Sequence, residues 1–242
     1  MDKIEETEKD LSRIFSRYLP WMDKPAKELE AVFEKHGTKK SFKKNAVFKF
    51  AYEKNDYMYF TKSGICCTFS TTESGQTNIS RLLTYGSIFG EVAPFCRVVS
   101  LTNTIALEDS VVYKLNYKKF VELISQDEVL VGEAMKMMAW RIYAYHVGVF
   151  VKSTYHKEEM MALLFKSLMD YDALENNHAP LKYHLNHQQI SELIGASRET
   201  VSRTLSQWHK HKILVKEDKD TIVNYQALDL ILANCPYHLS QG

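Results

Sequence analysis

The spacing of hydrophobic residues divides the chain into a helical start, a strand-rich stretch and a helical remainder. Four apolar residues between Leu11 and Tyr18 share one helical face, and Gly37 ends this first stretch. From about residue 41 to 115, short runs such as NAVFKF, YMYFTK, ICCTFSTT and TNISRLL alternate with turn residues. Strands this short, with turns this frequent, predict a small all-β sandwich or barrel.

From about residue 117 the hydrophobic residues again recur at helical spacing. The stretch 126–152 is long, has no proline and is apolar over more than one stripe. This is typical of a helix that is buried on two sides, for example against its own domain and against a partner subunit. A further helix is expected at 158–172, and ILVKEDKDTIVNY reads as a hairpin that turns at Asp218–Lys219–Asp220.

Residues 186–211 (NHQQISELIGASRETVSRTLSQWHKH) have the order expected of a helix-turn-helix. Asn186 can cap a first helix, with Gln189 as its capping-box partner. Gly195 allows the positive φ that a tight turn between helices needs. Ser197 is a good cap for the second helix.

A helical wheel at about 100° per residue separates two arcs of the second helix. The packing arc consists of Val201, Thr204, Leu205 and Trp208. The outward arc consists of Arg198, Glu199, Ser202, Arg203 and Ser206. Arginine can donate two hydrogen bonds to guanine, and glutamate can accept one from cytosine, so this arc suits DNA. The alternative is an ordinary surface helix with solvated charges.

The amino-acid composition limits the classes of protein that remain possible. The chain has 242 residues, 45% of them hydrophobic and 25% charged, with net charge +1, so neither disorder nor a generally basic protein is indicated. It has no run of about 18 apolar residues and no signal-peptide pattern, which predicts a cytoplasmic protein without a membrane partner.

The cysteines and the common catalytic motifs point away from disulfides and from catalysis. Four cysteines, Cys66, Cys67, Cys96 and Cys235, make no disulfide framework in a chain of this length. Alternation along a strand predicts one member of Cys66–Cys67 in the core and one outside. No GxGxxG, P-loop, HExxH or CxxC motif occurs, so we expect no enzyme.

Several segments resemble the Crp/Fnr superfamily of bacterial transcription regulators. GASRETVSR resembles its recognition helix, YMYFTKSGI a strand ending in a glycine turn, and YGSIFGEVAPF its Gly-Glu signature. NYKKFVELI resembles the helix that leads to the dimer helix, and DTIVNY resembles the wing strand. The resemblance implies an α+β fold. Its parts would be an N-terminal helical segment and cyclic-nucleotide-binding-like β-roll (jelly roll) over 1–125, a dimerisation helix over 126–152, and a winged helix-turn-helix over 153–242.

The same resemblance implies a homodimer that binds a palindromic operator in double-stranded DNA and works with RNA polymerase. Arg198, Glu199 and Arg203 match the three base-reading positions, with Ser202 between them. Ser197 and His187 complete the set of residues that we expect at the DNA. An effector would shift the balance between two arrangements of the helix-turn-helix pair, with a hinge near Lys152–Tyr155.

The effector site departs from the pattern of the cyclic-nucleotide-binding members. Gly90 and Glu91 are present, but Leu101–Thr102 stand where those members carry Arg-Ser. Without that arginine a buried phosphate has no counter-charge, which argues against cyclic AMP unless a loop shift brings Arg97 into place. We therefore expect a different small-molecule effector and no certain cofactor.

Three alternatives of the same fold stay open, namely a redox sensor, a haem sensor and a constitutively active regulator. The first cysteine is Cys66, so an N-terminal iron–sulfur ligand set is absent. His146 could serve as an axial haem ligand. The effector-site candidates are Gly90, Glu91, Tyr85, Phe89, Thr102, Tyr143, Tyr145 and His146. Aromatic packing would explain the rings among them equally well.

Overall fold

The computed structural model describes residues 20–218 and 220–233 and divides into two compact units. One unit runs from Met22 to Ala144, and the other combines Trp21 with the chain from Tyr145 onward. The long helix α5 (Glu128–Thr154) belongs partly to each.

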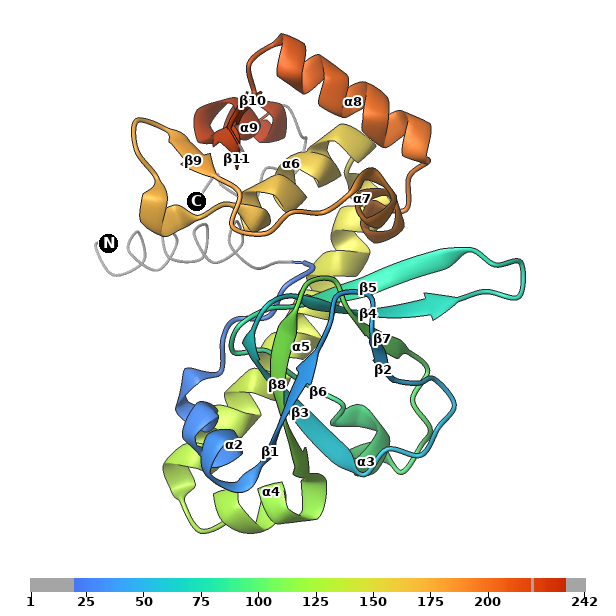
Figure 1. The fold of residues 1–242 in the computed structure, drawn as a ribbon, viewed down its shortest axis with the longest axis vertical. Coiled ribbons are helices and arrows are strands. Elements are labelled where there is room, and N and C mark those ends of the chain that lie inside the picture. Colours follow the sequence, from blue (N-terminus) through green and yellow to red (C-terminus); the bar gives the residue numbers. More distant parts are fainter. Residues whose placement is uncertain (1–19, 219, 234–242) are drawn as a thin grey trace. The chain divides into compact units, whose positions relative to one another are not determined.

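The first unit contains two four-stranded antiparallel sheets and a few helices (Figure 1). One sheet has the order β1 (Thr38–Phe42), β8 (Ser110–Asn116), β3 (Tyr57–Ser63), β6 (Ile88–Phe89). The other has the order β2 (Val47–Lys49), β7 (Asn103–Ala106), β4 (Cys66–Thr71), β5 (Thr77–Leu83). The helices are η1 (Lys27–Leu29), α2 (Glu30–His36), α3 (Val92–Cys96) and α4 (Tyr117–Ile124). Non-sequential strand neighbours in two sheets are the arrangement expected of a β-roll.

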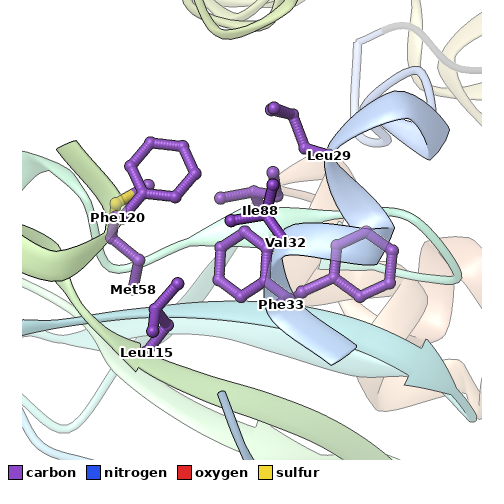
Figure 2. Close-up of a cluster of buried hydrophobic side chains, with 8 residues drawn as sticks. Leu29, Val32, Phe33, Met58, Ile88, Leu115 and Phe120 are labelled. Carbon is purple, nitrogen blue, oxygen red and sulfur yellow. The ribbon is translucent and has the colours of Figure 1, made fainter. Parts of the chain in front are cut away.

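Helices α2 and α4 pack on one sheet through a cluster of buried apolar side chains (Figure 2). The members are Leu29, Val32, Phe33, Met58, Phe60, Ile88, Leu115 and Phe120. The ring centroid of Phe33 lies 5.6 Å from those of both Phe60 and Phe120. Burial of each such ring contributes about 1.5–3 kcal/mol, so this cluster holds both helices to the sheet.

A second core cluster contains stacked aromatic rings. It consists of Tyr59, Cys66, Leu83, Phe89, Ala106 and Val112, with Phe42 and Phe48 packed against it. The rings of Phe42 and Phe48 stack at 4.1 Å, and those of Tyr59 and Phe89 stack at 5.0 Å. Aromatic rings therefore occupy much of this core.

The expectation for Cys66 and Cys67 was wrong, because both side chains are buried. They do alternate across β4, but Leu82, which pairs with Cys67, is fully buried too. The second face of the sheet is therefore also covered at this point. Burial raises the pKa of the Cys66 thiol to about 11. Cys96 is exposed, and Cys235 lies outside the described residues.

The second unit is a helical domain with a small sheet. Its helices are α6 (Lys157–Leu168), η2 (Tyr171–Ala173), α7 (His187–Ile194), α8 (Arg198–Lys210) and α9 (Tyr225–Ala233). The antiparallel sheet has the order β10 (Leu214–Glu217), β11 (Asp220–Asn224), β9 (His178–Pro180). Strands β10 and β11 form the predicted hairpin, with Glu217 paired to Asp220, while Lys219 in its turn lies outside the described residues.

The predicted strand runs and long helices are confirmed, with some additions. The stretch predicted as helix 126–152 is α5, and the run at 158–172 contains α6. The strands β1, β6 and β9 and the helices α3 and α9 were not predicted, and β9 lies at residues 178–180, where the sequence indicated a loop. The apolar face at Leu11–Tyr18 lies outside the described residues, and residues 20–26 are not helical. Among the described residues, no helix has the length and hydrophobicity to cross a membrane.

Candidate nucleic-acid interface and effector site

Helix α7 and the turn after it have the predicted local geometry. The N–H of Gln189 donates to Asn186 Oδ1, and the N–H of Asn186 donates to Gln189 Oε1, each at 2.9 Å. Gly195 then has φ 63° and ψ 45°, in the left-handed region. These residues confirm the capping box and the glycine turn.

Ser197 caps helix α8, and its Oγ accepts from the N–H of Thr200 at 3.1 Å. The residues of the packing arc, Val201, Thr204, Leu205 and Trp208, are all buried. The Trp208 indole N–H donates to Glu158 Oε1 of α6 at 2.9 Å, and its ring meets Phe165 edge-on at 5.3 Å. Helix α8 is thus fixed to α6 through the face opposite its charges.

The outward arc is open to solvent. Arg198, Glu199 and Arg203 are exposed, and neither arginine forms a salt bridge with another described residue. His187 Nδ1 lies 2.8 Å from Ser202 Oγ, so this contact joins the first helix to the second. The arrangement leaves two guanidinium groups available to an external partner.

Glu199 carries a carboxylate that is held in its charged form. A hydrogen bond from its own backbone N–H lowers its pKa below the usual range, and the Ser197 hydroxyl and the Arg198 charge act in the same direction. A carboxylate that stays charged is a hydrogen-bond acceptor, as the amino group of cytosine requires.

In the β-sheet unit, Glu91 belongs to a buried network of four charged side chains. Its Oε1 pairs with Arg141 of α5, and Asp23 Oδ2 lies 3.1 Å from Arg81 and 3.3 Å from Arg141. Both arginines also donate to the Ile88 carbonyl, at 3.1 and 2.7 Å. Burial lowers the pKa of Arg81, whereas for Arg141 the two carboxylates outweigh burial and raise it.

The other candidates near Glu91 have structural partners. Phe89 is buried in the aromatic stack, and the Tyr85 hydroxyl donates to Glu30 Oε2 at 2.5 Å. Gly90 has φ 86°, and a Cβ there would lie 2.8 Å from the Tyr57 carbonyl oxygen, so only glycine fits. Packing and hydrogen bonding therefore account for these positions without a ligand.

Lys49 is a buried cation that the sequence reasoning missed. Its Nζ donates to Ser100 Oγ at 2.5 Å and to the Thr102 carbonyl at 2.7 Å, beside the segment where the arginine of cyclic-nucleotide-binding members is missing. Burial lowers its pKa. No local signal predicted this burial, because alternation places Lys49 on the opposite side of β2 from Phe48, where a lysine is expected to be exposed.

Of the candidates on α5, Tyr143 is exposed and lies in the first unit, whereas Tyr145 and His146 lie in the second. Tyr145 is 74% exposed, and His146 is exposed as well. Both fall in the second unit, whereas Tyr85, Phe89, Gly90, Glu91 and Thr102 lie in the first. Among the described residues, no group of three or more His, Cys, Asp or Glu side chains could hold a metal ion.

The first unit also contains a cavity of about 560 Å³ between α4, α5, β3 and α3. Its wall is mostly apolar, and Glu91 is part of it. None of the other effector-site candidates lines this cavity.

Comparisons with known proteins agree with both units. Residues 39–127 match the cyclic nucleotide-binding domain, and residues 162–231 match the Crp-like helix-turn-helix domain. This chain belongs to the Crp/Fnr family. Regulators of this family bind DNA and act as dimers. A Crp/Fnr regulator is not an enzyme, which confirms the expectation from the motifs.

Two curated relatives and one solved structure illustrate the similarity of this Crp/Fnr regulator to known proteins. It is 26% identical to the "Cyclic AMP receptor protein" of Thermus thermophilus over 148 residues, 61% of this chain and 66% of that protein. It is 26% identical to the "Fumarate and nitrate reduction regulatory protein" of Yersinia pestis over 198 residues, 79% of this chain and 77% of that protein. The structure of FixK2 from Bradyrhizobium japonicum has a TM-score of 0.69 at 21% identity, over 80% of this chain and 96% of FixK2.

Proposed function

We propose that this Crp/Fnr regulator binds a palindromic DNA site as a homodimer and responds to a small molecule other than cyclic AMP. The β-roll up to residue 125 would sense, the helix over 126–152 would dimerise, and residues 153–242 would bind DNA and work with RNA polymerase. The observation that carries the proposal is the exposed arc of Arg198, Glu199 and Arg203 on a helix whose other face is buried.

The proposed reading of bases follows from the chemistry of these side chains. An arginine without an intramolecular ion pair can donate two hydrogen bonds to O6 and N7 of guanine, and a charged glutamate can accept from cytosine N4. Ser197, which caps α8, and His187, which contacts Ser202, would contact the phosphate backbone of the DNA. Bases and phosphates would thus be contacted by different members of one surface.

The proposed dimer rests on an exposed apolar stripe along α5. Its members are Met135, Met138, Ile142, Tyr145 and Val149, which are between 38% and 74% exposed. Their spacing alternates between three and four residues, as in the seam of a coiled coil. A second copy related by two-fold symmetry would cover the stripe and present two copies of α8 to an inverted repeat.

An effector other than cyclic AMP is favoured by two features of the β-roll. Aromatic rings fill much of the core that Phe89 shares with Tyr59. Leu101–Thr102 supply no guanidinium, and Arg97, at the end of α3, is exposed. The Thermus relative is named for cyclic AMP, whereas this chain has no arginine at the matching position, and the buried Lys49 nearby is already hydrogen-bonded to Ser100 and to the Thr102 carbonyl.

Constitutive activity is the second candidate, and it is favoured by the same packed aromatic core, which leaves less room for a ligand. The redox and haem alternatives have less support. The pKa of buried Cys66 is raised, which disfavours its reactive thiolate. His146 is exposed on α5.

Fluorescence anisotropy with labelled duplexes tests the proposal at a stated salt concentration. The resemblance to Crp/Fnr members with the same Arg-Glu and second Arg implies half-sites with a TGTGA core. A palindrome with two TGTGA half-sites should bind about a thousand-fold more tightly than a scrambled duplex, and cyclic AMP should leave both affinities unchanged. Equal affinity for the two duplexes would contradict specific binding. A gain in affinity with cyclic AMP would contradict the proposed effector class.

A further inference from the structure

The imidazole of His187 contacts the middle of the outward arc of α8. His187 is the first residue of α7, and α7 and α8 are neighbours in the second unit (Figure 1). Its Nδ1 lies 2.8 Å from Ser202 Oγ. Ser202 stands between Arg198 and Arg203 in the arc and is partly buried, whereas His187 is exposed. An exposed ring on one helix therefore holds a hydroxyl at the centre of the surface that faces outward on the next.

The Ser202 hydroxyl is oriented by this contact and by no other side chain or carbonyl of the described residues. Ser206, one turn further along α8, is different, because its Oγ donates to the Ser202 carbonyl at 2.9 Å. The hydroxyl proton of Ser206 is thus used within the helix. What Ser202 offers to an outside partner depends instead on His187.

The protonation of Nδ1 decides the direction of the hydrogen bond between the two side chains. When Nδ1 carries no proton, it accepts the hydroxyl proton, and the lone pairs of Ser202 Oγ are left for an outside donor. When Nδ1 carries a proton, it donates to Ser202 Oγ, and the hydroxyl proton is left for an outside acceptor.

The second ring nitrogen selects between these two cases. At pH 8 an ordinary imidazole is neutral and carries a single N–H. Nε2 of His187 has no hydrogen-bond partner among the described residues and belongs to an exposed side chain. A phosphate oxygen accepts only, so a contact between Nε2 and the DNA backbone requires the proton on Nε2. Nδ1 must then accept from Ser202. This step rests on the proposed function, in which His187 contacts the phosphate backbone.

We propose that His187 sets the direction of the Ser202 hydroxyl, so that Ser202 accepts a hydrogen bond from a base with an amino group. Adenine N6 and cytosine N4 are the donors of this kind in the major groove, whereas thymine and guanine present acceptors there. The pair adds discrimination at one position of each half-site. His187 is a positioning residue, because it acts on the base through Ser202.

The test measures affinity at pH 8 for palindromes that carry each of the four bases in turn at every half-site position. Ser202→Ala identifies the position that Ser202 reads, since discrimination is lost there. At this position the wild-type protein should prefer an amino base about five-fold, the ratio expected for one neutral hydrogen bond. A preference for thymine or guanine, or no position that Ser202→Ala relaxes, would overturn the proposal.

His187→Arg separates the two contacts of the histidine. Arginine keeps a donor for the phosphate but has no acceptor for the Ser202 proton. This variant should therefore lose the preference for an amino base at the Ser202 position and at no other. In a Ser202→Ala protein it should change the discrimination no further, because the two residues act as one unit. An equal change of affinity on all duplexes would show a phosphate contact alone and would overturn the role of His187.

Two matched variants control for charge and for the loss of a hydroxyl, with folding of all variants checked by circular dichroism. His211→Arg adds the same charge at the C-terminal end of α8, away from Ser202. Ser206→Ala removes a hydroxyl that is bound within the helix. Both should discriminate among the duplexes as the wild type does. Loss of the amino-base preference in either variant would contradict the assignment to His187 and Ser202.

The tautomer can be measured on its own by ¹⁵N NMR of the imidazole in the complex with a duplex of any sequence. We expect a protonated Nε2 and an Nδ1 without a proton, and a protonated Nδ1 would overturn the proposal. The titrations also separate this proposal from the proposed function. A wild-type protein without preference among the duplexes would contradict specific binding as a whole. Preference for the palindrome that His187→Arg leaves unchanged at every position would contradict the positioning role alone.

Discussion

Arginines of this chain occur in two kinds of surroundings. Arg81 and Arg141 are largely buried and pair with Asp23, so they hold elements of the β-roll together. Arg198 and Arg203 are exposed and form no salt bridge with another described residue. Fixing a long arginine side chain costs conformational entropy. An arginine that has no ion-pair partner within the described residues is therefore suited to bind a partner outside the chain.

Replacement of Arg203 by alanine should weaken binding to the specific site by about 1–3 kcal/mol and binding to random DNA much less. The reason is that a contact to a base edge exists only at the correct sequence. Anisotropy titrations on both duplexes measure the difference. Arg97→Ala removes the same charge from an exposed position in the other unit and should change neither affinity. Equal losses on both duplexes would rule out base reading by Arg203.

The buried thiol gives a second prediction at this scale. Burial raises the pKa of Cys66 to about 11, so at pH 8.5 it stays protonated and should not react with a disulfide reagent in the folded protein. Cys66→Ser should therefore leave the number of fast-reacting thiols unchanged, whereas Cys96→Ser should lower it by one, because Cys96 is exposed. A fast-reacting Cys66 would revive the redox alternative.

At the scale of elements, the turn between α7 and α8 depends on one backbone conformation. Gly195 has φ 63°, and an added Cβ would meet no atom within 4 Å, so any cost of a side chain there comes from the backbone alone. The turn sets the direction in which α8 presents its charges. A glycine at position 195 therefore matters, because it adopts the left-handed conformation without strain.

Gly195→Ala should destabilise the protein by about 1–2 kcal/mol, since a left-handed conformation is unfavourable for alanine. Gly132→Ala is the matched control, because it also adds a methyl group in open space but within helix α5. It should stabilise by about 0.5–1 kcal/mol. Urea denaturation measures both. A Gly195→Ala variant as stable as wild type would contradict the strained turn.

Elements that depend on neighbouring residues could be predicted from the sequence, and those that depend on distant ones could not. The caps at Asn186 and Ser197 and the packing arc of α8 lie within 25 residues and are as predicted. The pairing of Glu91 with Arg141 joins residues 50 positions apart, and β1 is held by pairing with β8. No local pattern reports such contacts.

The exposed arc of α8 could be predicted for the same reason, since its residues share one helix and its cap. The surroundings of the effector-site candidates could not be predicted, because these residues come from several strands and helices. Phe89 and Tyr85 are aromatic residues in the expected segment, yet their neighbours in space are Tyr59 and Glu30. The buried contacts of Lys49 and the apolar cavity of the first unit became visible only in the fold.

At the scale of the whole molecule, the apolar stripe of α5 should hold two copies together. Ile142→Glu places a charge in the middle of the stripe, where Ile142 is 61% exposed in the single chain. We expect this variant to sediment as a monomer where wild type sediments as a dimer. Val98→Glu changes an apolar residue that is 53% exposed outside the stripe and should remain dimeric. A dimeric Ile142→Glu protein would place the interface elsewhere.

The central claim is that two copies of α8 read an inverted repeat. Selection of bound duplexes from a fully random library tests it most directly, because it presupposes no site. The account predicts enrichment of an inverted repeat with half-sites about one helical turn apart, and no such enrichment by a protein that carries Arg198→Ala, Glu199→Ala and Arg203→Ala together. Enrichment of no sequence, or of the same sequence by the triple variant, would contradict it.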